Sequence, residues 1–426
     1  MATDASFAGQ MRDDMFSQLA PDARELVGRI VATGAARGGV FAAGGVVRDA
    51  IIGRAIVDVD IVTEGDAIEI VAAAAPDADA TAHDRFRTAS LNVSGTRIDV
   101  ATARRETYSR PGALPGVAPA SIDADLRRRD FTMNAIALRL DGPPMLLDPC
   151  GGITDVDAKR IRVLHDASFA DDATRIFRAL RYGARLGFAL EANTLRLLRA
   201  GASYIETIGG ERVRRELALM LSEASAGAAL EACEREGVLA ATHPALAWDR
   251  RCSDAITGTT GALVARLPLG FALLAAHASP NEAEAIIARL KLTHDEATAV
   301  RGIAAMADVP TMLRRPQAKP SGVVVLLDRY PAASVAAIAG VATDEIVSHL
   351  ALRYLEEWRY VQPMLRGGDI IELGVPTGPQ VQRALQLVRA ARLDGWAQDR
   401  GDEQALVLRF AKSIRDSGSE SAMDVT

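Results

Sequence analysis

The acids Asp58 and Asp60 are the residues of this chain whose type and spacing most clearly permit chemistry. They are two residues apart in residues 56–62, where apolar and polar side chains alternate over the centre, so we predict a strand with both carboxylates on one face. Two such carboxylates repel each other unless a cation joins them, and hard oxygen ligands favour Mg²⁺ held jointly with substrate phosphates. The pair therefore suits two-metal nucleotidyl transfer. Asp99, on a second predicted strand, is a candidate third carboxylate.

A glycine pair precedes these acids. Gly44 and Gly45 follow the apolar run 40–43 and open a segment of helical character, 46–52, so we expect their backbone N–H groups to be free to hold a phosphate. Asp58 comes thirteen residues after Gly45, which leaves room for one short helix and a return to the sheet. We therefore expect the phosphate site to lie beside the acids. The dinucleotide-binding and P-loop classes lack their sequence motifs here.

A second pair of charged residues suits the recognition of a base. Asp172 and Arg175 lie one turn apart in a predicted helix, 172–186, and would share a face of it. A carboxylate accepts from an exocyclic amino group and a guanidinium donates to the adjacent ring nitrogen, so cytosine and adenine fit, whereas uracil and guanine present a carbonyl where a donor is needed. A structural ion pair at a helix start is the alternative. Three arginines continue this helix and suit a triphosphate, RNA or solvent: Arg178, Arg181 and Arg185.

Two parts of the chain, with different sequence patterns, must position these residues. Residues 39–148 show mixed α/β patterns, with a hairpin expected around Ser94-Gly95-Thr96 and a long loop over 104–126, where proline and glycine replace the apolar periodicity. After residue 149, apolar residues recur at three- and four-residue spacing and no comparable strand signal follows. We therefore predict an α+β protein with a mixed sheet first and helices afterwards.

Composition narrows the class of protein. The chain has 426 residues, of which 49% are hydrophobic and 24% charged, which excludes disordered and fibrous classes and predicts several domains. No apolar stretch is long enough for a bilayer and no secretory signal is visible, so we expect a cytoplasmic protein. Three scattered cysteines, Cys150, Cys233 and Cys252, fit a reducing compartment. The net charge is −6, but residues 159–215 carry 12 basic residues against 6 acidic ones, a local footprint suited to nucleic acid.

In their order along the chain, these motifs resemble those of the class II tRNA nucleotidyltransferases and bacterial poly(A) polymerases, within the DNA polymerase β-like superfamily. The resemblance covers residues 39–222, roughly the first half of the chain. Five segments carry it: Gly44-Gly45-x-x-Arg48-Asp49 with Asp58-x-Asp60; the loop 104–126; Arg128-Arg129-Asp130-Phe131-Thr132-Met133-Asn134-Ala135; Asp171-Asp172-x-x-Arg175; and Glu211-Arg212-Val213-Arg214-Arg215-Glu216-Leu217.

The resemblance implies a role for each segment. Asp58 and Asp60 would bind the metal, the loop 104–126 would assist addition of the terminal A, and residues 211–217 would brace the site. The family usually has Glu in place of Asp171, so we give Asp172 more weight. We predict these residues to bind the nucleotide: Gly44, Gly45, Arg48, Arg128, Asp130, Asn134, Asp171, Asp172, Arg175, Arg178 and Arg181.

The resemblance also implies an architecture: a DNA polymerase β-like nucleotidyltransferase head followed by an all-α neck, body and tail. We expect an N-terminal extension (1–24), the catalytic head (25–148), a neck that selects the nucleotide (149–224), a tRNA-binding body and tail (225–415) and a disordered C-terminus (416–426), with residues 1–10 also disordered. The implied substrates are the tRNA 3′ end, CTP and ATP, with Mg²⁺ as cofactor. No membrane partner is expected, and the oligomeric state is left open.

Several functions share this core. Addition of the whole CCA end is favoured, because one chain with the loop and the Asp172–Arg175 template is sufficient for it. A-only addition, to which the loop segment 106–115 also conforms, and poly(A) synthesis stay open, whereas the long loop counts against CC-only addition. A different class, the HD-type phosphohydrolases, is suggested by His83-Asp84, His165-Asp166 and His294-Asp295, but no further His and Asp complete a metal set. An inactive RNA-binding module would require the aspartate pair to be lost or misplaced.

Overall fold

The computed structural model describes residues 5–108, 110, 112, 115–315 and 319–423. The chain divides into two compact units. The first comprises residues 1–217 and 235–242, and the second comprises residues 218–234 and 243–426. The boundary between the units falls near residue 217, close to the expected junction of neck and body at 224/225, while the expected junction of head and neck stays a prediction.

A seven-stranded sheet forms the centre of the first unit, with strand order β3-β4-β5-β2-β1-β8-β9. The pair β2·β5 is parallel and the other neighbours are antiparallel. The strands are β1 Val40–Ala43, β2 Asp58–Thr63, β3 Thr81–His83, β4 Thr88–Val93, β5 Thr96–Thr102, β8 Ala137–Arg139 and β9 Leu146–Leu147. The mixed sheet confirms the predicted α+β fold class.

Local sequence explains why the strands form where they do. In β2, Val59 and Ile61 are buried while Asp58 is exposed, so the alternation seen in the sequence separates the two faces of the strand. The predicted hairpin is β4–β5, and its tip residues Ser94 and Gly95 have φ of 50° and 81°, the left-handed backbone that tight hairpin turns require.

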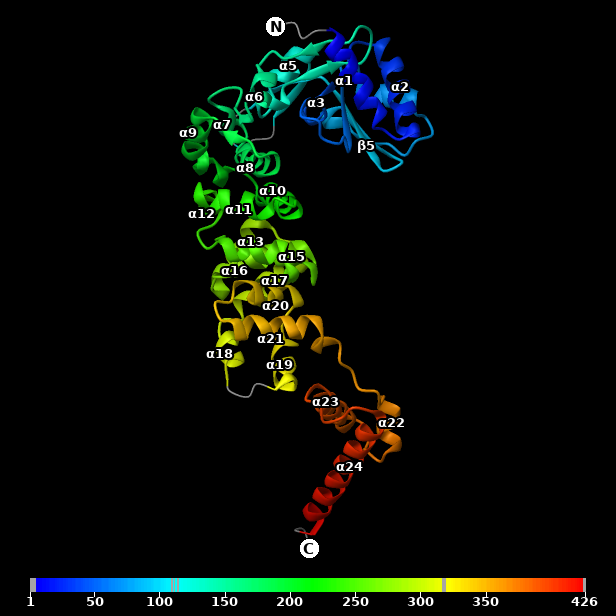
Figure 1. Cartoon of the computed structure of the whole chain (residues 1–426), viewed down its shortest axis with the longest axis vertical. Helices are drawn as coiled ribbons and strands as arrows, with labels where there is room; N and C mark the ends of the chain where they lie inside the picture. The colour runs from blue at the N-terminus through cyan, green and yellow to red at the C-terminus, as the bar shows by residue number, and fades with distance from the viewer. Residues whose placement is uncertain (1–4, 109, 111, 113–114, 316–318, 424–426) are drawn as a thin grey trace. The chain divides into compact units, whose positions relative to one another are not determined.

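Helices α1 Ala5–Ser17, α2 Pro21–Ala35, α3 Gly45–Ile51 and α4 Ala67–Ala74 accompany the sheet (Figure 1). The prediction that residues 1–10 are disordered is wrong from residue 5 onward, and residues 1–4 lie outside the described residues. Helix α1 buries Ala8, Met11 and Met15, and the Arg12 Nη1 donates to the carbonyl of Gly142 at 3.2 Å. Burial of these three side chains, which the sequence reading did not foresee, holds the segment in place.

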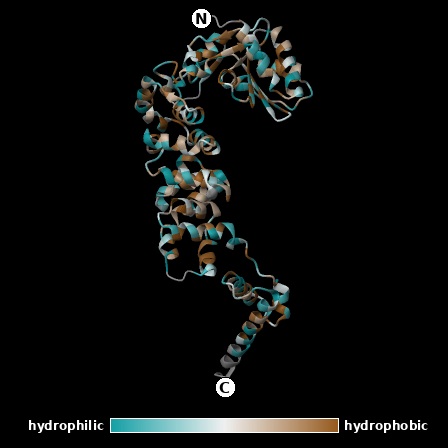
Figure 2. Ribbon diagram, viewed as in Figure 1, coloured by the Kyte–Doolittle hydropathy of each residue, from teal (hydrophilic) through white to brown (hydrophobic). Residues whose placement is uncertain are grey.

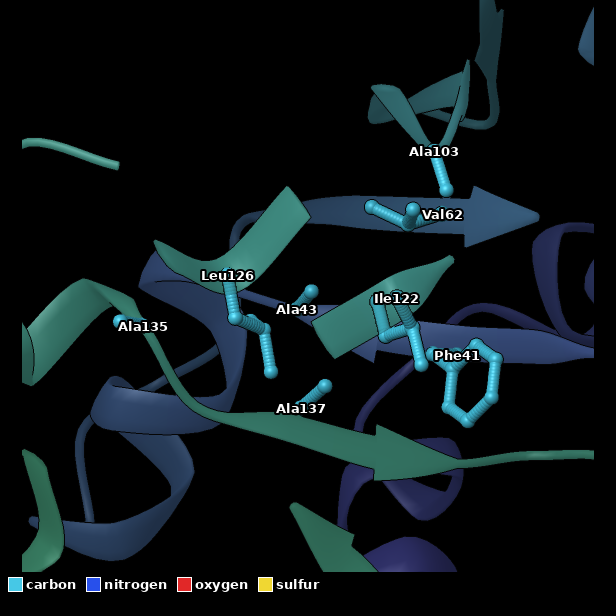
Figure 3. Packing of buried hydrophobic residues seen from close by; sticks show 8 residues of the cluster. All are labelled: Phe41, Ala43, Val62, Ala103, Ile122, Leu126, Ala135 and Ala137. Carbon is cyan, nitrogen blue, oxygen red and sulfur yellow. The ribbon is translucent and has the colours of Figure 1, made fainter. Parts of the chain in front are cut away.

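The segment 104–126 is not the structureless loop that we predicted. It contains the antiparallel pair β6 Arg104–Thr107 and β7 Gly116–Pro119, followed by α5 Ile122–Arg127, while residues 109, 111, 113 and 114 lie outside the described residues. Figure 3 shows Ile122 and Leu126 of α5 beside Phe41, Ala43 and Ala137 of the sheet, in one buried cluster. A six-residue helix with only two large apolar side chains gives too little periodicity to be recognised in sequence.

The rest of the first unit is mainly helical. Its elements are η2 Thr132–Asn134, α6 Gly152–Asp157, β10 Arg160–Ile161, α7 Ser168–Asp171, α8 Thr174–Leu186, β11 Ala189–Leu190, α9 Ala192–Gly201, η3 Ala202–Thr207, α10 Gly210–Ser222, whose last residues belong to the second unit, and α12 Val238–Thr242. The expected helices at 192–200 and 210–222 are confirmed. The small parallel pair β10·β11 was not predicted, because two-residue strands carry no periodicity.

The described residues of the second unit form helices, as predicted for this half of the chain. They are α11 Ala226–Arg235, α13 Arg250–Thr257, α14 Thr259–Ala262, α15 Arg266–Leu274, α16 Pro280–Leu290, α17 His294–Ala304, α18 Val309–Leu313, α19 Pro320–Leu327, α20 Ala332–Val341, α21 Glu345–Glu356, η4 Trp358–Tyr360, α22 Gly367–Glu372, α23 Pro379–Leu393 and α24 Arg400–Met423. Helix α24 includes residues 416–423 of the expected disordered tail, whose disorder stays a prediction.

Hydropathy does not single out a membrane segment. Across the described residues no individual helix has the length and apolar character needed to cross a bilayer; α19 and α20 meet the criterion only when joined across a 116° bend. Most of the α20 side chains are buried inside the second unit. Figure 2 shows hydrophobic and hydrophilic residues on most of the helices.

Candidate active site

A cavity of about 730 Å³ in the first unit gathers most of the predicted site. It is lined by twelve of the predicted residues: Gly44, Gly45, Arg48, Asp58, Asp60, Arg128, Asp130, Asn134, Asp172, Arg175, Arg178 and Arg181. Asp99 and Asp171 do not line it. Eight arginines and six carboxylates share its wall, so the cavity suits a polyanion such as a nucleoside triphosphate.

The acid pair lies where the sequence placed it, on one face of β2. Asp60 stands opposite Asp99 in the register of the parallel pair β2·β5. Burial raises the pKa of Asp60 to about 6; the Arg129 guanidinium acts against this rise, and the neighbouring carboxylates of Asp99 and Asp58 add to it. Burial is the largest cause of this rise, and a divalent cation bound beside the carboxylate would favour its charged form.

Asp99 is already engaged by the protein. Its carboxylate accepts a hydrogen bond from the Ser90 Oγ at 2.5 Å and forms an ion pair with the Arg97 Nε at 2.9 Å. A catalytic role for Asp99 stays a prediction, and it would require this ion pair to open.

The described part of the chain contains no group of three or more His, Cys, Asp or Glu side chains arranged as metal ligands. The His-Asp pairs at 83–84, 165–166 and 294–295 thus gain no further ligands from the fold. The two-carboxylate arrangement of Asp58 and Asp60 suits Mg²⁺, which keeps several waters and shares its coordination with substrate phosphates.

Gly44 forms the turn between β1 and α3. Its φ of 87° and ψ of −128° lie in a region that favours glycine, and a Cβ built at this position would come within 2.4 Å of the Arg129 Nη1. The glycine therefore permits both the turn and the close approach of Arg129, a cavity residue that our sequence analysis did not select.

Arg48, Asn134, Asp130 and Arg178 form one polar network beside this turn. The Arg48 Nη1 donates to the Asn134 Oδ1 at 2.5 Å, and the Asn134 Nδ2 donates to the Asp130 Oδ1 at 2.9 Å. The Arg178 Nη2 lies 2.7 Å from the Asp130 Oδ2. Although burial acts to raise the pKa of Asp130, the charge of Arg178 and hydrogen bonds from Asn134 and Arg178 lower it to about 2. The network is therefore charged and held in one arrangement.

Asp172 and Arg175 line the same cavity, but they do not lie one turn apart on a single helix as predicted. Asp172 has extended backbone (φ −144°, ψ 100°) between α7 and α8, and its Oδ1 accepts from the Thr174 N and Oγ1 at 3.0 and 2.8 Å, as a capping residue does. The helix starts later than expected because the Asp side chain competes for the first N–H groups.

Arg175 is fully within α8 and buried. Its Nη1 donates to the Ser168 Oγ at 2.7 Å and its Nη2 donates to the carbonyl of Arg128 at 2.9 Å. Asp171 ends α7 with a carboxylate 3.7 Å from the His165 Nε2, outside the cavity lining. The nucleotide-binding role expected of Asp171 stays a prediction.

The segment 104–126 also reaches the cavity. The Glu106 Oε1 accepts from the Arg128 Nη1 at 2.8 Å, and its Oε2 accepts from the Tyr108 hydroxyl at 2.8 Å. Burial, together with the hydrogen bond to Glu106, raises the pKa of the Tyr108 phenol. Glu106 and Tyr108 were not predicted as site residues, and their place in a predicted loop offered no periodic signal.

The sequence did not predict four other residues of the cavity wall as site residues, Asp49, Arg54, Thr174 and Tyr182, and it offered Arg185 only as suited to a triphosphate, RNA or solvent. Asp49 could have been found, because it follows Arg48 within the glycine motif. Tyr182 could not, since an aromatic residue in an amphipathic helix ordinarily packs in the core.

Two family models match parts of this chain. A family model described as the poly A polymerase head domain matches residues 40–162, and one described as the probable RNA- and SrmB-binding site of polymerase A matches residues 187–249.

Curated relatives carry three related names. An A-adding tRNA nucleotidyltransferase of Geobacter sulfurreducens is 31% identical over 88% of this chain, and a CC-adding tRNA nucleotidyltransferase of Deinococcus radiodurans is 31% identical over 86% of this chain and 87% of its own length. A CCA-adding enzyme of Geobacillus stearothermophilus is 31% identical over 83% of this chain and 88% of its own length. The chain spans 45% of the length of the Geobacter protein and 20% of an A-adding relative from Aquifex aeolicus.

Solved structures give the same result. A CCA-adding enzyme in an apo form has a TM-score of 0.79 and 26% identity, covering 92% of this chain and 97% of that one. A Thermotoga maritima CCA-adding enzyme complexed with tRNA has a TM-score of 0.75 and 26% identity, covering 93% and 98%. The chain therefore belongs to the family of tRNA nucleotidyltransferases and poly(A) polymerases.

Proposed function

We propose that this protein adds C, C and A to the 3′ end of tRNA, using CTP and ATP and releasing pyrophosphate. One observation carries the proposal: the acid pair Asp58 and Asp60 and the base-reading pair Asp172 and Arg175 line the same cavity of about 730 Å³. Because both pairs share one cavity, a single nucleoside triphosphate can contact the acids through its phosphates and the second pair through its base. Relatives named CCA-adding enzymes, and solved complexes of such enzymes with ATP and with CTP, support the proposal.

The proposal includes Mg²⁺ as the cofactor, held by Asp58 and Asp60. The raised pKa of Asp60 supports this assignment, since burial first and then the charges of Asp99 and Asp58 disfavour its ionised form, which a bound cation would stabilise. When bound, Mg²⁺ would supply Lewis acidity to the attacking hydroxyl and to the phosphate oxygens. Attack of the RNA 3′ hydroxyl on the α-phosphorus then forms one P–O bond and breaks the bond to pyrophosphate.

The remaining residues bind and orient the nucleotide. We propose that Arg48, Asn134, Asp130 and Arg178, which form the polar network beside the Gly44 turn, position the sugar and triphosphate. The Asp172 carboxylate would accept from the exocyclic amino group of C or A while Arg175 donates to the ring nitrogen. Arg175 would exchange one of its present acceptors, Ser168 or Arg128, for the base.

The second unit would hold the tRNA. This part of the proposal rests on the likeness, over most of the chain, to the Thermotoga maritima enzyme complexed with tRNA. The match of residues 187–249 to a probable RNA-binding model adds residues of the first unit to it, since 187–217 and 235–242 belong to that unit. We place the activity in the cytoplasm, where tRNA, CTP and ATP are available together.

A-only addition is the second candidate. The A-adding relatives favour it, with 31% identity over 399 residues for the Geobacter sulfurreducens protein and 47% over 163 residues for the Aquifex aeolicus protein. It would use the same acid pair and the same cavity, so the geometry of the first unit serves both candidates.

One experiment separates them. Purified protein is incubated with Mg²⁺, CTP and ATP, alone and together, and with three tRNA substrates that lack the last three, the last two or only the last nucleotide of the CCA end; the products are sequenced. The proposal expects completion of all three. Completion of only the third substrate would establish the A-adding alternative, and no incorporation into any of them would refute nucleotidyl transfer to tRNA.

A further inference from the structure

Tyr182 occupies an unusual place in the cavity wall. It lies on α8, only 8% of its surface is exposed, and the guanidinium carbons of four arginines lie 5.0–5.5 Å from the centre of its ring. These are Arg181 at 5.0 Å, Arg185 at 5.1 Å, Arg48 at 5.4 Å and Arg178 at 5.5 Å. A phenol ring attracts cations to its face through its quadrupole, and it does so more strongly where water is excluded.

Three of the four arginines belong to α8 itself, but Arg48 comes from α3, the helix that directly follows the Gly44 turn. A second element of the head also reaches the ring, because Phe131 meets it edge-on with centroids 6.0 Å apart and an interplanar angle of 89°. Tyr182 thus joins the helix that carries the base-reading Arg175 to the segments that carry the phosphate turn and the residues 130–134.

Tyr182 belongs to a closed ring of contacts, in which each residue contacts the next and the last contacts Tyr182 again. The ring faces Arg48, and Arg48 donates to Asn134. Asn134 donates to Asp130, and Arg178 donates to the same carboxylate through Nε at 2.9 Å. The Arg178 Nη2 finally donates to the Tyr182 hydroxyl at 3.1 Å. We call this set of five residues from three segments the Tyr182 circuit.

We propose that Tyr182 is a positioning residue. It holds the guanidinium groups of Arg48 and Arg178 in fixed positions on the cavity wall, so that the contacts to the sugar and triphosphate keep a fixed geometry relative to the base-reading pair. This inference rests on the proposed function. Groups that fix the orientation of ligand-contacting side chains ordinarily affect ligand affinity without touching the ligand themselves. Because the circuit contains neither Asp172 nor Arg175, Tyr182 should act equally on CTP and ATP.

The test compares Tyr182→Phe, which removes only the hydroxyl, with Tyr182→Leu, which also removes the ring. Equilibrium binding of CTP and of ATP is measured by calorimetry with Mg²⁺ and without tRNA, followed by steady-state addition to trimmed tRNA. Tyr182→Leu should weaken the binding of both nucleotides by about tenfold and raise both KM values, with a smaller change in kcat and an unchanged preference for CTP over UTP. Tyr182→Phe should lose less, about threefold, because the ring contact with Arg48 persists while the hydrogen bond from the Arg178 Nη2 is lost.

Tyr354→Leu is the matched control. Tyr354 is also a buried tyrosine (5% exposed) whose hydroxyl donates to a carboxylate, that of Asp328 at 2.9 Å, but it belongs to the second unit. Loss of its ring should lower stability and leave nucleotide binding unchanged. Where Tyr182→Leu is too unstable to assay, Tyr182→Met, which keeps more of the side-chain volume, takes its place with the same expectation.

Three outcomes would overturn the inference: unchanged binding in Tyr182→Leu, equal losses in Tyr182→Phe and Tyr182→Leu, or equal losses in Tyr354→Leu. A loss for only one of the two nucleotides would likewise overturn it, because that would make Tyr182 a base-selecting residue. Failure of the proposed function would give a different result in the same assays, since the unaltered protein would then bind CTP and ATP but add nothing to tRNA.

Discussion

The Arg212 Nη2 donates to the Asp172 Oδ1 at 2.8 Å and so connects α10 to the carboxylate proposed to read the base. The same oxygen accepts from the Thr174 N and Oγ1, so three hydrogen bonds converge on it. Residues 211–217 were expected only to brace the site. The hydrogen bond from Arg212 to Asp172 is one contact by which this segment reaches the site.

Arg212→Ala should reduce discrimination between CTP and UTP by roughly fivefold, which corresponds to the loss of about 1 kcal/mol from a partly buried, charge-assisted hydrogen bond. Competitive incorporation with both nucleotides measures this ratio. Arg215→Ala, which removes the same charge from an exposed position of α10, is the control. An equal loss in both variants would attribute the effect to net charge and would contradict the role given to the ion pair.

Asp172→Ala should impair the choice of nucleotide more than it impairs tRNA binding, because Asp172 lies in the nucleotide cavity of the first unit. We expect the preference for CTP over UTP to fall by at least about tenfold, since the acceptor for the exocyclic amino group is lost. The ratio of kcat/KM for the two nucleotides, together with a tRNA-binding isotherm, measures both effects. A variant that still prefers CTP to the normal extent would remove Asp172 from base recognition.

Asp58→Ala and Asp60→Ala should each lower incorporation by roughly a thousandfold, since either change removes half of the proposed metal site. The fold should persist, because Asp58 is exposed and the Asp60 carboxylate is not favoured by its surroundings, as its raised pKa indicates. Thermal melting checks the fold, and Asp77→Ala, an exposed acid of the same unit, controls for lost charge. Retained activity in Asp60→Ala at saturating Mg²⁺ would exclude the two-carboxylate site.

Gly44→Ala should weaken CTP and ATP binding. The substitution forces a positive φ on a residue with a Cβ, which costs about 1–2 kcal/mol, and it also displaces the Arg129 Nη1 from its place beside the turn. Gly95→Ala is a close match, because Gly95 also has a positive φ, 81°, but a Cβ there meets nothing within 4 Å. Both variants should lose stability, and only Gly44→Ala should lose nucleotide affinity in calorimetry. Equal affinities in the two variants would show that Arg129 need not approach the turn.

Asp130 should give the protein a pH-dependent part of its stability. Its pKa lies at about 2 in the folded protein, below the ordinary value of 3.8, because Arg178 and Asn134 favour the charged form despite burial. A lowered pKa contributes stability that is fully present above pH 3.8 and is lost as the pH falls through 2, in all about 2 kcal/mol. Urea unfolding of the unaltered protein and of Asp130→Asn at several pH values should therefore give free energies that converge at low pH. A difference that is constant with pH would contradict the charged network.

The sequence by itself determined the local elements that carry the chemistry. Alternation over residues 56–62 was enough to place Asp58 and Asp60 on one face, because a strand has a period of two residues regardless of its neighbours. The glycine pair predicted the turn between β1 and α3, and the helical spacing predicted a helix over 172–186, of which α8 lacks only the first two residues. Each of these signals depends only on residues a few positions apart.

Only the tertiary structure decided which distant residues meet. Tyr182 faces Arg48 across more than a hundred residues of chain, and Glu106 binds Arg128 from a segment without recognisable periodicity. The start of α8 after Asp172, rather than before it, likewise depends on competition between the Asp side chain and the helix for the same N–H groups. Such contacts follow from how the sheet and helices pack, and packing free energy is shared among many side chains, so no short segment of sequence contains it.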